Sequence, residues 1–386
     1  MRKLFSIVFS AVLPLIVSAQ GTWAQNVKVW DLGTYPGGTW ATLGDINDLG
    51  VAVGFGDVPD GSTHPLAVSV FGPHAGEWID LGTLGGTDSG WEEGYNRVSD
   101  TGVIVGYSNT AKGYTHGTAW TEKSGLVDLG TLADIGYASY KASAASGVNK
   151  LGTLIVGWSG VEESCFGCAP SLPVVWTRSV EWKKGTPIGT WKIQKLDIAG
   201  ADEGTTHWYP FNVNDLGQIV GVSNTGDGPV SVLWTPLPNG KGWKLTRLAS
   251  VSGYPMGNAY NINDRGEITG MMLPADFSVW VPVYWKPSDP LRRTYSQPIV
   301  LACPPGYASG YTDGINELGE MTGECWGDAG DQAVRWTTKD PSFSQVIGFP
   351  SDFSWSFGVN NLGIAVITYG GGNCTGATCA GAVRLH

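Results

Sequence analysis

The chain has 386 residues and a formal net charge of −11, which becomes −13 if the N-terminal leader with its two basic residues, Arg2 and Lys3, is removed. Such an acidic surface argues against a nucleic-acid partner and against binding to anionic membranes. Only 15% of the residues are charged, whereas 57 are Gly and 18 are Trp. Few charges, many turns and many aromatic residues are typical of an all-β extracellular protein.

The first residues predict a secretory signal peptide over residues 1–25. Met1-Arg2-Lys3 is basic, residues 4–17 are apolar, and small residues suited to cleavage precede positions 20 and 25. The apolar run is too short for a comfortable membrane span, and no later stretch is long and apolar enough for one. We therefore expect residues 26–386 to be exported, to the periplasm or the medium, as one repeat domain without membrane insertion.

A turn motif, Asn-Asp-x-Gly, is the unit of this domain. It recurs seven times with variation, and its glycines are Gly50, Gly102, Gly152, Gly217, Gly266, Gly319 and Gly363. The mean spacing is about 52 residues, in the range of blade-type repeats. Asn and Asp side chains can bond their own backbone and Gly accepts a positive φ, so each motif predicts a hairpin turn. Each turn offers one carboxylate at most, which is too few for a hard cation, and no metal or cofactor is expected.

Four short strands are predicted in each unit of about 50 residues. One enters the Asn-Asp turn, one leaves it, a third has the pattern Ala-Val-x-Trp (for example residues 333–336), and a fourth contains Asp-Leu-Gly (for example residues 80–82). The chain begins with a lone fourth-type strand at residues 27–33 and ends with a third-type strand. This order predicts an all-β fold, a seven-bladed β-propeller closed by the N-terminal strand.

These motifs, in this order, resemble the HAF repeat family of bacterial extracellular proteins. The resemblance rests on Asp80-Leu81-Gly82-Thr83-Leu84-Gly85-Gly86, on the Asn-Asp-x-Gly-x-x-Val-Gly hairpin and on the Ala-x-x-Trp strand. It covers nearly all of residues 26–386, although the His-Ala-Phe signature is degraded, as in His116-Gly117-Thr118. The resemblance implies export and repeated β-structure but no defined activity. Kelch propellers have the same arrangement of four strands in each repeat, which is an analogy of fold and no evidence of function.

Six cysteines in an exported chain favour disulfides over free thiols. Cys165 and Cys168 have redox-motif spacing but lie in a loop without the helix that such a motif needs. We predict local pairs Cys165–Cys168 and Cys374–Cys379, and a pair Cys303–Cys325 that joins neighbouring units.

Catalytic motifs are scarce. The sequence has five His and no nucleophile elbow, phosphate loop or His-Glu-x-x-His. His64 and His116 stand at the same place in two units, which indicates a structural role. Glu92-Glu93 and Asp202-Glu203 could serve glycoside cleavage, but such pairs in loops are usually solvated. No catalytic residue is therefore predicted.

The loops that join the fourth strand to the next unit carry an aromatic residue in every unit. Variable loops on a regular scaffold are common binding sites, and aromatic faces suit sugar rings or peptides. The alternative is that these aromatic residues are largely buried. The candidate binding residues are Trp40, Trp91, Tyr95, Tyr140, Trp208, Tyr209, Tyr254, Tyr307 and Trp355.

The function predicted from the sequence is a monomeric, non-enzymatic binding propeller. Its expected partner is an extracellular carbohydrate or an envelope protein. Two alternatives stay open: a glycan-active enzyme, hydrolase or lyase, that uses loop carboxylates, and a structural protein of the cell surface or matrix.

Overall fold

The computed structural model describes residues 28–89, 97–161, 170–183, 186–199, 206–224, 226, 228–238, 240–348, 351–372 and 374–386. The predicted signal peptide and the Cys165–Cys168 pair lie outside these ranges. The described residues contain strands and one short 3₁₀ helix, η1 (Leu132–Ile135), and no α-helix. No helix among them is long and apolar enough to cross a membrane. The all-β prediction is confirmed.

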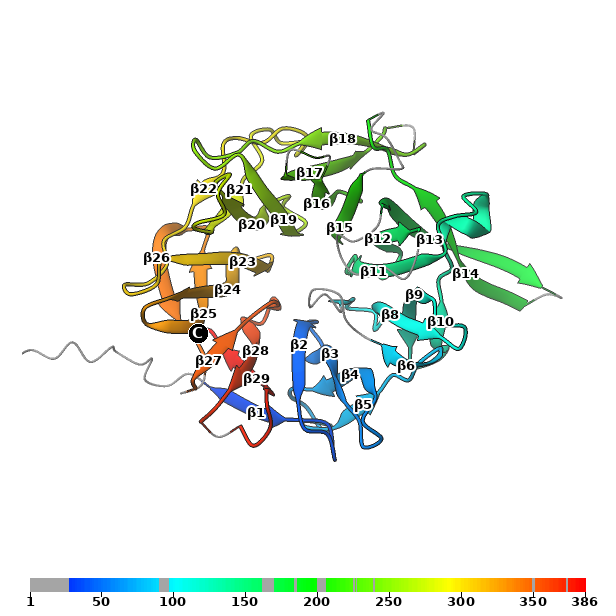
Figure 1. Ribbon diagram of the computed structural model, residues 1–386, viewed down its shortest axis with the longest axis horizontal. Coiled ribbons are helices and arrows are strands. Elements are labelled where there is room, and N and C mark those ends of the chain that lie inside the picture. Colours follow the sequence, from blue (N-terminus) through cyan, green and yellow to red (C-terminus); the bar gives the residue numbers. More distant parts are fainter. Residues whose placement is uncertain are drawn as a thin grey trace, which may run out of the picture.

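Antiparallel groups of strands surround a central axis, with one strand of each group nearest the axis (Figure 1). The first two groups contain β2 (Ala41–Ile46), β3 (Val51–Asp57), β4 (Thr63–Ser69) and β5 (Trp78–Asp80), then β6 (Gly85–Ser89), β7 (Arg97–Val98), β8 (Ile104–Thr110), β9 (Thr115–Thr121) and β10 (Gly125–Asp128). Next come β11 (Ala142–Val148), β12 (Leu154–Gly160), β13 (Ser171–Lys183) and β14 (Thr186–Lys195), followed by β15 (His207–Val213), β16 (Ile219–Asn224), β17 (Pro229–Pro236) and β18 (Trp243–Arg247).

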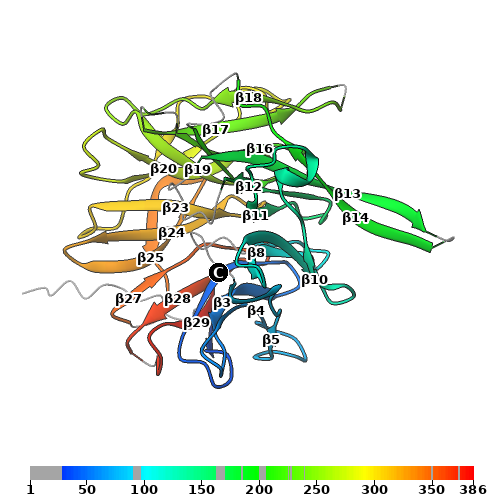
Figure 2. The ribbon, with the colours of Figure 1, turned by 45° about the vertical axis from the view of Figure 1, so that its right-hand side comes forward.

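The remaining groups repeat the same order around the axis. They contain β19 (Met256–Ile262), β20 (Ile268–Leu273), β21 (Val281–Trp285) and β22 (Ile299–Val300), then β23 (Ser309–Ile315), β24 (Glu320–Gly327), β25 (Gly330–Thr337) and β26 (Asp340–Val346). The last group is β27 (Phe353–Trp355), β28 (Ile364–Gly370), β29 (Cys379–Arg384) and β1 (Val29–Gly33). The β13–β14 hairpin is longer than the others and projects from the ring (Figure 2).

Tryptophans of the third strands join neighbouring groups. Four of them have exposed fractions of 0–1%, and each donates its indole N–H to a backbone carbonyl of the preceding repeat. The bonds are Trp176 to Leu129 (2.8 Å), Trp234 to Asp197 (2.7 Å), Trp285 to Ala249 (2.8 Å) and Trp336 to Ala302 (2.7 Å). A buried indole with its N–H bonded combines a large apolar area with a satisfied donor. These residues are therefore core wedges between sheets.

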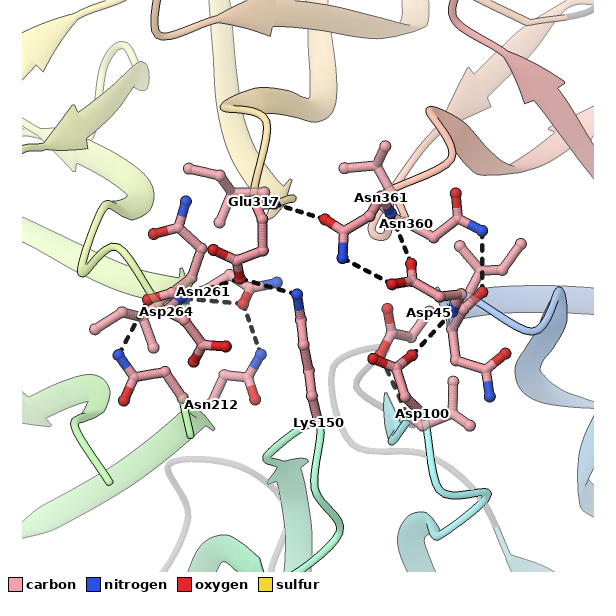
Figure 3. Close-up of a pocket in the computed structure, with 18 of the residues that line it drawn as sticks. Asp45, Asp100, Lys150, Asn212, Asn261, Asp264, Glu317, Asn360 and Asn361 are labelled. Atoms are coloured by element: carbon pink, nitrogen blue, oxygen red, sulfur yellow. Dashed lines mark hydrogen bonds and ion pairs between the residues drawn. The ribbon is translucent and has the colours of Figure 1, made fainter. Parts of the chain in front are cut away.

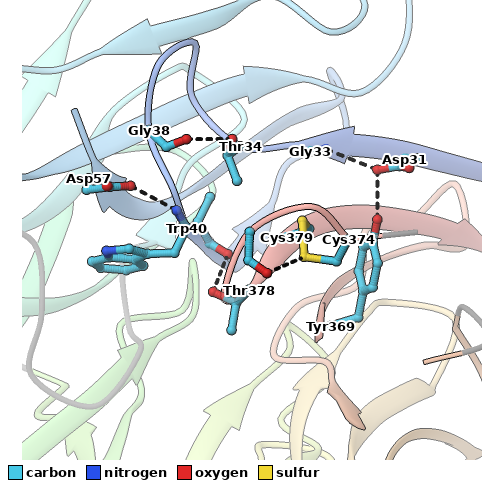
Figure 4. Close-up of a disulfide and its surroundings, with 12 residues drawn as sticks. Asp31, Gly33, Thr34, Gly38, Trp40, Asp57, Tyr369, Cys374, Thr378 and Cys379 are labelled. Carbon is cyan, nitrogen blue, oxygen red and sulfur yellow. Dashed lines mark hydrogen bonds between the residues drawn. A yellow bond between two sulfur atoms is a disulfide. The ribbon is translucent and has the colours of Figure 1, made fainter. Parts of the chain in front are cut away.

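The chain ends meet in the last group of strands. β1 pairs antiparallel with β29, with Val29 opposite Val383 and Trp30 opposite Ala382, so the predicted pairing of the N-terminal strand with the end of the chain is confirmed. The Tyr369 hydroxyl donates to Asp31 at 2.8 Å beside the Cys374–Cys379 disulfide (Figure 4). The Thr378 hydroxyl donates to the Ala41 carbonyl at 3.1 Å and so joins this group to the first one.

Both predicted disulfides that fall on described residues are present. Cys303–Cys325 joins the loop after β22 to β24, and Cys374–Cys379 closes the loop between β28 and β29. Disulfides are typical of exported proteins, in agreement with the expected localisation.

Deletion of residues 26–33 should lower the melting temperature by more than about 5 °C, because β29 would keep β28 but lose its second neighbour, β1, and the core would lose the packing of Trp30 and Leu32. Thermal unfolding followed by circular dichroism measures this. Val29→Ala, at a 42% exposed position, is the control and should change little. An unchanged melting temperature after the deletion would contradict the role of β1 in closing the ring.

Candidate functional site

The Asn turns gather at one end of the central axis, where hydrogen bonds join them around the ring (Figure 3). Each Asn accepts from its own turn through Oδ1 and donates from Nδ2 to the next repeat, as Asn360 does to the Asn47 carbonyl at 2.9 Å. The other donations to a backbone carbonyl are Asn47 to Ser99 (3.0 Å), Asn214 to Asn263 (3.0 Å), Asn263 to Asn316 (3.0 Å) and Asn316 to Asn360 (2.8 Å). We call this set of turns the turn belt.

The residue after each Asn forms a second circuit of the turn belt. In six repeats its side chain accepts a backbone N–H from the preceding repeat, as Asp264 does from Asp215 at 2.8 Å and Glu317 from Asp264 at 3.0 Å. In the third repeat, where the residue is Lys150, its backbone carbonyl accepts from Asp100 instead. The circuit closes where Asp48 accepts from Asn361 at 2.8 Å. The sequence predicted that these acids would bond their own turns. Instead they hold neighbouring repeats together.

Lys150 is the basic member of this circuit. Its ammonium lies 2.8 Å from Glu317 across the axis (Figure 3). Burial alone would lower the pKa of Lys150, but the bond to Glu317 and the surrounding carboxylates raise it. Burial raises the pKa values of Asp100 and Asp264. The pocket enclosed here measures about 70 Å³, which holds only one or two waters. Among the described residues no cluster of three His, Cys, Asp or Glu suits a metal. The hydrogen bonds of the turn belt hold neighbouring repeats together.

Behind the turn belt, a buried ion group crosses the axis. The Arg97 guanidinium lies 2.7 Å from Asp313 and donates to the Gly44 carbonyl at 3.1 Å. Arg97 and Asp313 have exposed fractions of 1% and 0%. Asp45 accepts from the Val98 N–H at 3.2 Å, and burial, opposed by the Arg97 charge, raises its pKa to about 6. Three repeats are thus joined through the middle of the ring.

At the opposite end of the ring, one sheet carries a cluster of acidic and aromatic side chains. Tyr311 on β23 is paired with Glu324 on β24, and Trp326 on β24 is paired with Asp331 on β25. Directly opposed residues and residues two apart project from the same face of a sheet. Tyr311, Glu324, Trp326 and Asp331 therefore share one face, and we call them the Glu324 cluster.

Aromatic rings enclose this cluster. The ring centroids of Tyr311 and Trp326 are 6.1 Å apart, those of Trp280 and Trp326 5.6 Å, and those of Tyr311 and Phe357 6.3 Å. Burial raises the pKa of the Glu324 carboxyl to about 7, an effect opposed by a hydrogen bond with Tyr311 and reinforced by the Asp331 charge. A carboxyl that titrates near neutral pH can both donate and accept a proton during catalysis.

Sequence reasoning missed Glu324, although the repeats contain a signal for it. The residue that follows the second glycine of each motif is apolar in five repeats: Phe55, Tyr107, Trp158, Val222 and Met271. Glu324 occupies the same place in the sixth. Thr368 stands there in the seventh repeat, so Glu324 is the one carboxyl at this position. A carboxyl at a largely apolar repeat position costs stability, so a functional reason is expected.

The structure places the nine predicted aromatic residues in different surroundings. Trp91 and Tyr95 lie outside the described residues, as do the acidic pairs Glu92-Glu93 and Asp202-Glu203. Tyr140, Trp208 and Tyr209 are buried in the core, with exposed fractions of 8%, 3% and 4%. Partly exposed are Trp40, Tyr254, Tyr307 and Trp355, each packed on a neighbouring ring or core cluster.

Two histidines hold third and fourth strands together. His64 Nδ1 lies 2.8 Å from Asp80, and His116 Nδ1 lies 2.8 Å from Asp128. Ser62 Oγ is 3.1 Å from His64 Nε2, which outlines a Ser-His-Asp array. However, the Ser62 hydroxyl also bonds Asp60, and the matching histidine in the next repeat, His116, has Tyr114 in the place of the serine. The His–Asp pairs are consistent with the structural role expected for both histidines.

No protein-family model matches the sequence, and no curated protein matches it either. Solved structures do match. One comes from a study of two prolyl endopeptidases and the role of inter-domain dynamics in their catalysis: it is 12% identical, with a TM-score of 0.53, over 88% of this chain and 47% of that chain. A puromycin hydrolase mutant in complex with PGG is 12% identical, with a TM-score of 0.51, over 86% of this chain and 50% of that one.

This chain thus spans about half the length of each of these enzymes, and at such low identity the likeness shows the fold alone, an all-β propeller-like fold. The prediction of a propeller without chemistry is contradicted by these comparisons, because the two solved structures described above come from enzymes. The resemblance to the HAF repeat family stays a prediction.

Asn360→Ala should lower the free energy of unfolding by about 2–4 kcal/mol, since it leaves the Asn47 carbonyl and the Ile364 N–H without their partner in a buried site. Denaturant unfolding measures this. Leu362→Ala, at the exposed apex of the same turn, is the control and should stay within about 0.5 kcal/mol of the wild type. Equal effects of the two substitutions would contradict the turn belt as a source of stability.

Glu324→Gln should change how stability depends on pH. Because the folded-state pKa of Glu324 is about 7 against an ordinary 4.5, its contribution is complete below pH 4.5 and is lost as the pH rises through 7. Gln cannot lose a proton, so the variant should gain about 2 kcal/mol over the wild type between pH 5 and pH 8. Denaturant unfolding at both values measures the difference, and a gain that does not change with pH would contradict the raised pKa.

Proposed function

We propose that the chain is a glycan-active enzyme on a seven-bladed β-propeller, with Glu324 as general acid. The observation that carries the proposal is the environment of Glu324, a half-buried carboxyl with a pKa of about 7 that is set among aromatic rings beside a second carboxylate. A protonated carboxyl next to a charged one is the arrangement with which most glycosidases cleave their substrates.

Each member of the Glu324 cluster has a role in this reaction. Glu324 gives its proton to the glycosidic oxygen as the bond to the anomeric carbon breaks. Asp331 takes a proton from the water that attacks the same carbon, and that proton returns to Glu324 through solvent after the products leave. Tyr311 holds the Glu324 carboxyl by a hydrogen bond and positions it. Trp280 and Trp326 offer partly exposed faces on which a sugar ring can stack.

The spacing of the two carboxylates is compatible with this role. Asp331 is a diagonal neighbour of Glu324 on adjacent strands, and such neighbours have Cα atoms about 7–8 Å apart. Flexible side chains of this length can bring their carboxylates to the roughly 6.5–9.5 Å that admits a water in inverting enzymes.

Further support comes from the features expected of an exported enzyme. The Cys303–Cys325 disulfide lies beside the Glu324 cluster and links the strand of Glu324 to the preceding loop. We infer export by the signal peptide over residues 1–25, seven units within residues 26–386, and membership of the HAF repeat family.

Glu324→Gln should abolish glycan turnover while the protein stays folded, because the amide has no proton to give. The assay measures reducing ends released from a panel of neutral and acidic polysaccharides. Asp331→Asn should lower the rate by at least about 100-fold. Glu122→Gln, an exposed acid in the β9–β10 turn, is the control and should keep the wild-type rate. The wild-type rate should fall above about pH 7, where Glu324 loses its proton.

Full activity in Glu324→Gln would remove this residue from the mechanism. Turnover of peptides without turnover of any glycan would show that the substrate is a peptide and not a glycan. No turnover of either class would favour the alternative of a structural protein of the cell surface or matrix.

A further inference from the structure

A cleft lies at the same end of the ring as the Glu324 cluster. It measures about 510 Å³ and is lined by the β8–β9 turn, by η1 with its flanking loop, and by the residue before β11. Turns between second and third strands, such as β8–β9 and β24–β25, lie opposite the Asn turns. The charged and aromatic residues of the cleft are Lys112, Tyr114, His116, Asp128, Asp134 and Lys141. Its volume is that of a pocket for a small molecule.

Both acids of the cleft are bonded within the protein. Asp134 accepts the Thr131 N–H at 2.8 Å, in the capping box of η1. Asp128 accepts the Gly130 N–H at 2.8 Å and is paired with His116. The hydrogen bond that His116 donates to Asp128 raises the pKa of His116.

The two lysines of the cleft are placed differently. Lys112 and Lys141 are exposed, and neither has an ion pair within the part of the chain that the structure describes. The Lys141 ammonium lies 6.0 Å from the centroid of the Tyr114 ring. The cleft therefore presents two unneutralised ammonium groups beside a half-buried aromatic face.

We propose that this cleft binds a carboxylate-bearing sugar, so that the glycan on which the enzyme acts is a uronate-containing polymer. The ammonium groups pair with the carboxylate, and the Tyr114 ring packs against the apolar face of the sugar. The substrate class rests on the proposed function, whereas the binding site stands on the cleft alone. The net charge of −11 opposes the approach of a polyanion, but at physiological salt charges more than about 8 Å away are largely screened, so the groups that line the cleft decide whether the carboxylate binds.

Calorimetric titration tests the cleft. The probes are trigalacturonate, the neutral trigalactose of the same linkage, and inorganic phosphate. Wild type should bind trigalacturonate at least about tenfold more tightly than either of the other two. The double variant Lys112→Met, Lys141→Met should lose at least about tenfold in this affinity. Lys123→Met, an exposed lysine in the β9–β10 turn outside the cleft, should bind like the wild type.

Equal binding of the charged and neutral trisaccharides, or full binding by the double variant, would overturn the proposal. Phosphate bound as tightly as trigalacturonate would make the cleft a site for free anions and would also overturn it. Glu324→Gln separates the two proposals. If this variant binds trigalacturonate and wild type turns over no glycan, the cleft stands and the proposed activity fails. If turnover depends on Glu324 but the double variant binds normally, the activity stands and the cleft fails.

Discussion

The ring depends on the bifunctional amide of the turn asparagines. In one side chain, Oδ1 accepts a backbone N–H of its own turn and Nδ2 donates to a backbone carbonyl of the next repeat. One residue type therefore stabilises its own hairpin and holds the next repeat beside it. A carboxylate could do only the first and a lysine only the second. Because the carbonyls involved are buried, each bond is costly to break. Asn360 joins the last repeat to Asn47 of the first, while Ser99, which replaces Asn in the second repeat, is followed by Asp100, whose N–H donates to the Lys150 carbonyl of the third.

This arrangement gives the two ends of the ring different roles. At the turn end, the turn belt, Lys150 and the Arg97–Asp313 pair are engaged in contacts between repeats. Little space and few free donors are left for a ligand there. At the other end, side chains such as Glu324 and Lys141 differ between repeats without loss of closure. Function is therefore expected where the repeats differ.

Sequence reasoning predicted the features that recur in every repeat, which are the strands and hairpins. It also predicted the pairing of β1 with β29 and both described disulfides. What it missed depends on contacts across the ring. The bond of Asp264 to the preceding repeat requires the turns to converge on one axis, and Arg97 meets Asp313 across 216 positions of sequence. The aromatic loops looked accessible because sequence position does not reveal burial, whereas Trp208 packs at 6.1 Å from Trp234.

The Glu324 cluster also explains the position of a disulfide. Holding a carboxyl at a pKa of about 7 costs stability at neutral pH, up to about 3 kcal/mol on the full shift from 4.5. Cys325 follows Glu324 directly and is joined to Cys303, 22 residues earlier, and a loop of that length contributes roughly 3 kcal/mol when it is closed. The two effects are of the same size and act on the same strand. A cross-link placed there offsets the cost of the buried acid and keeps β24 in register with Tyr311, which a larger apolar core elsewhere in the ring would not do.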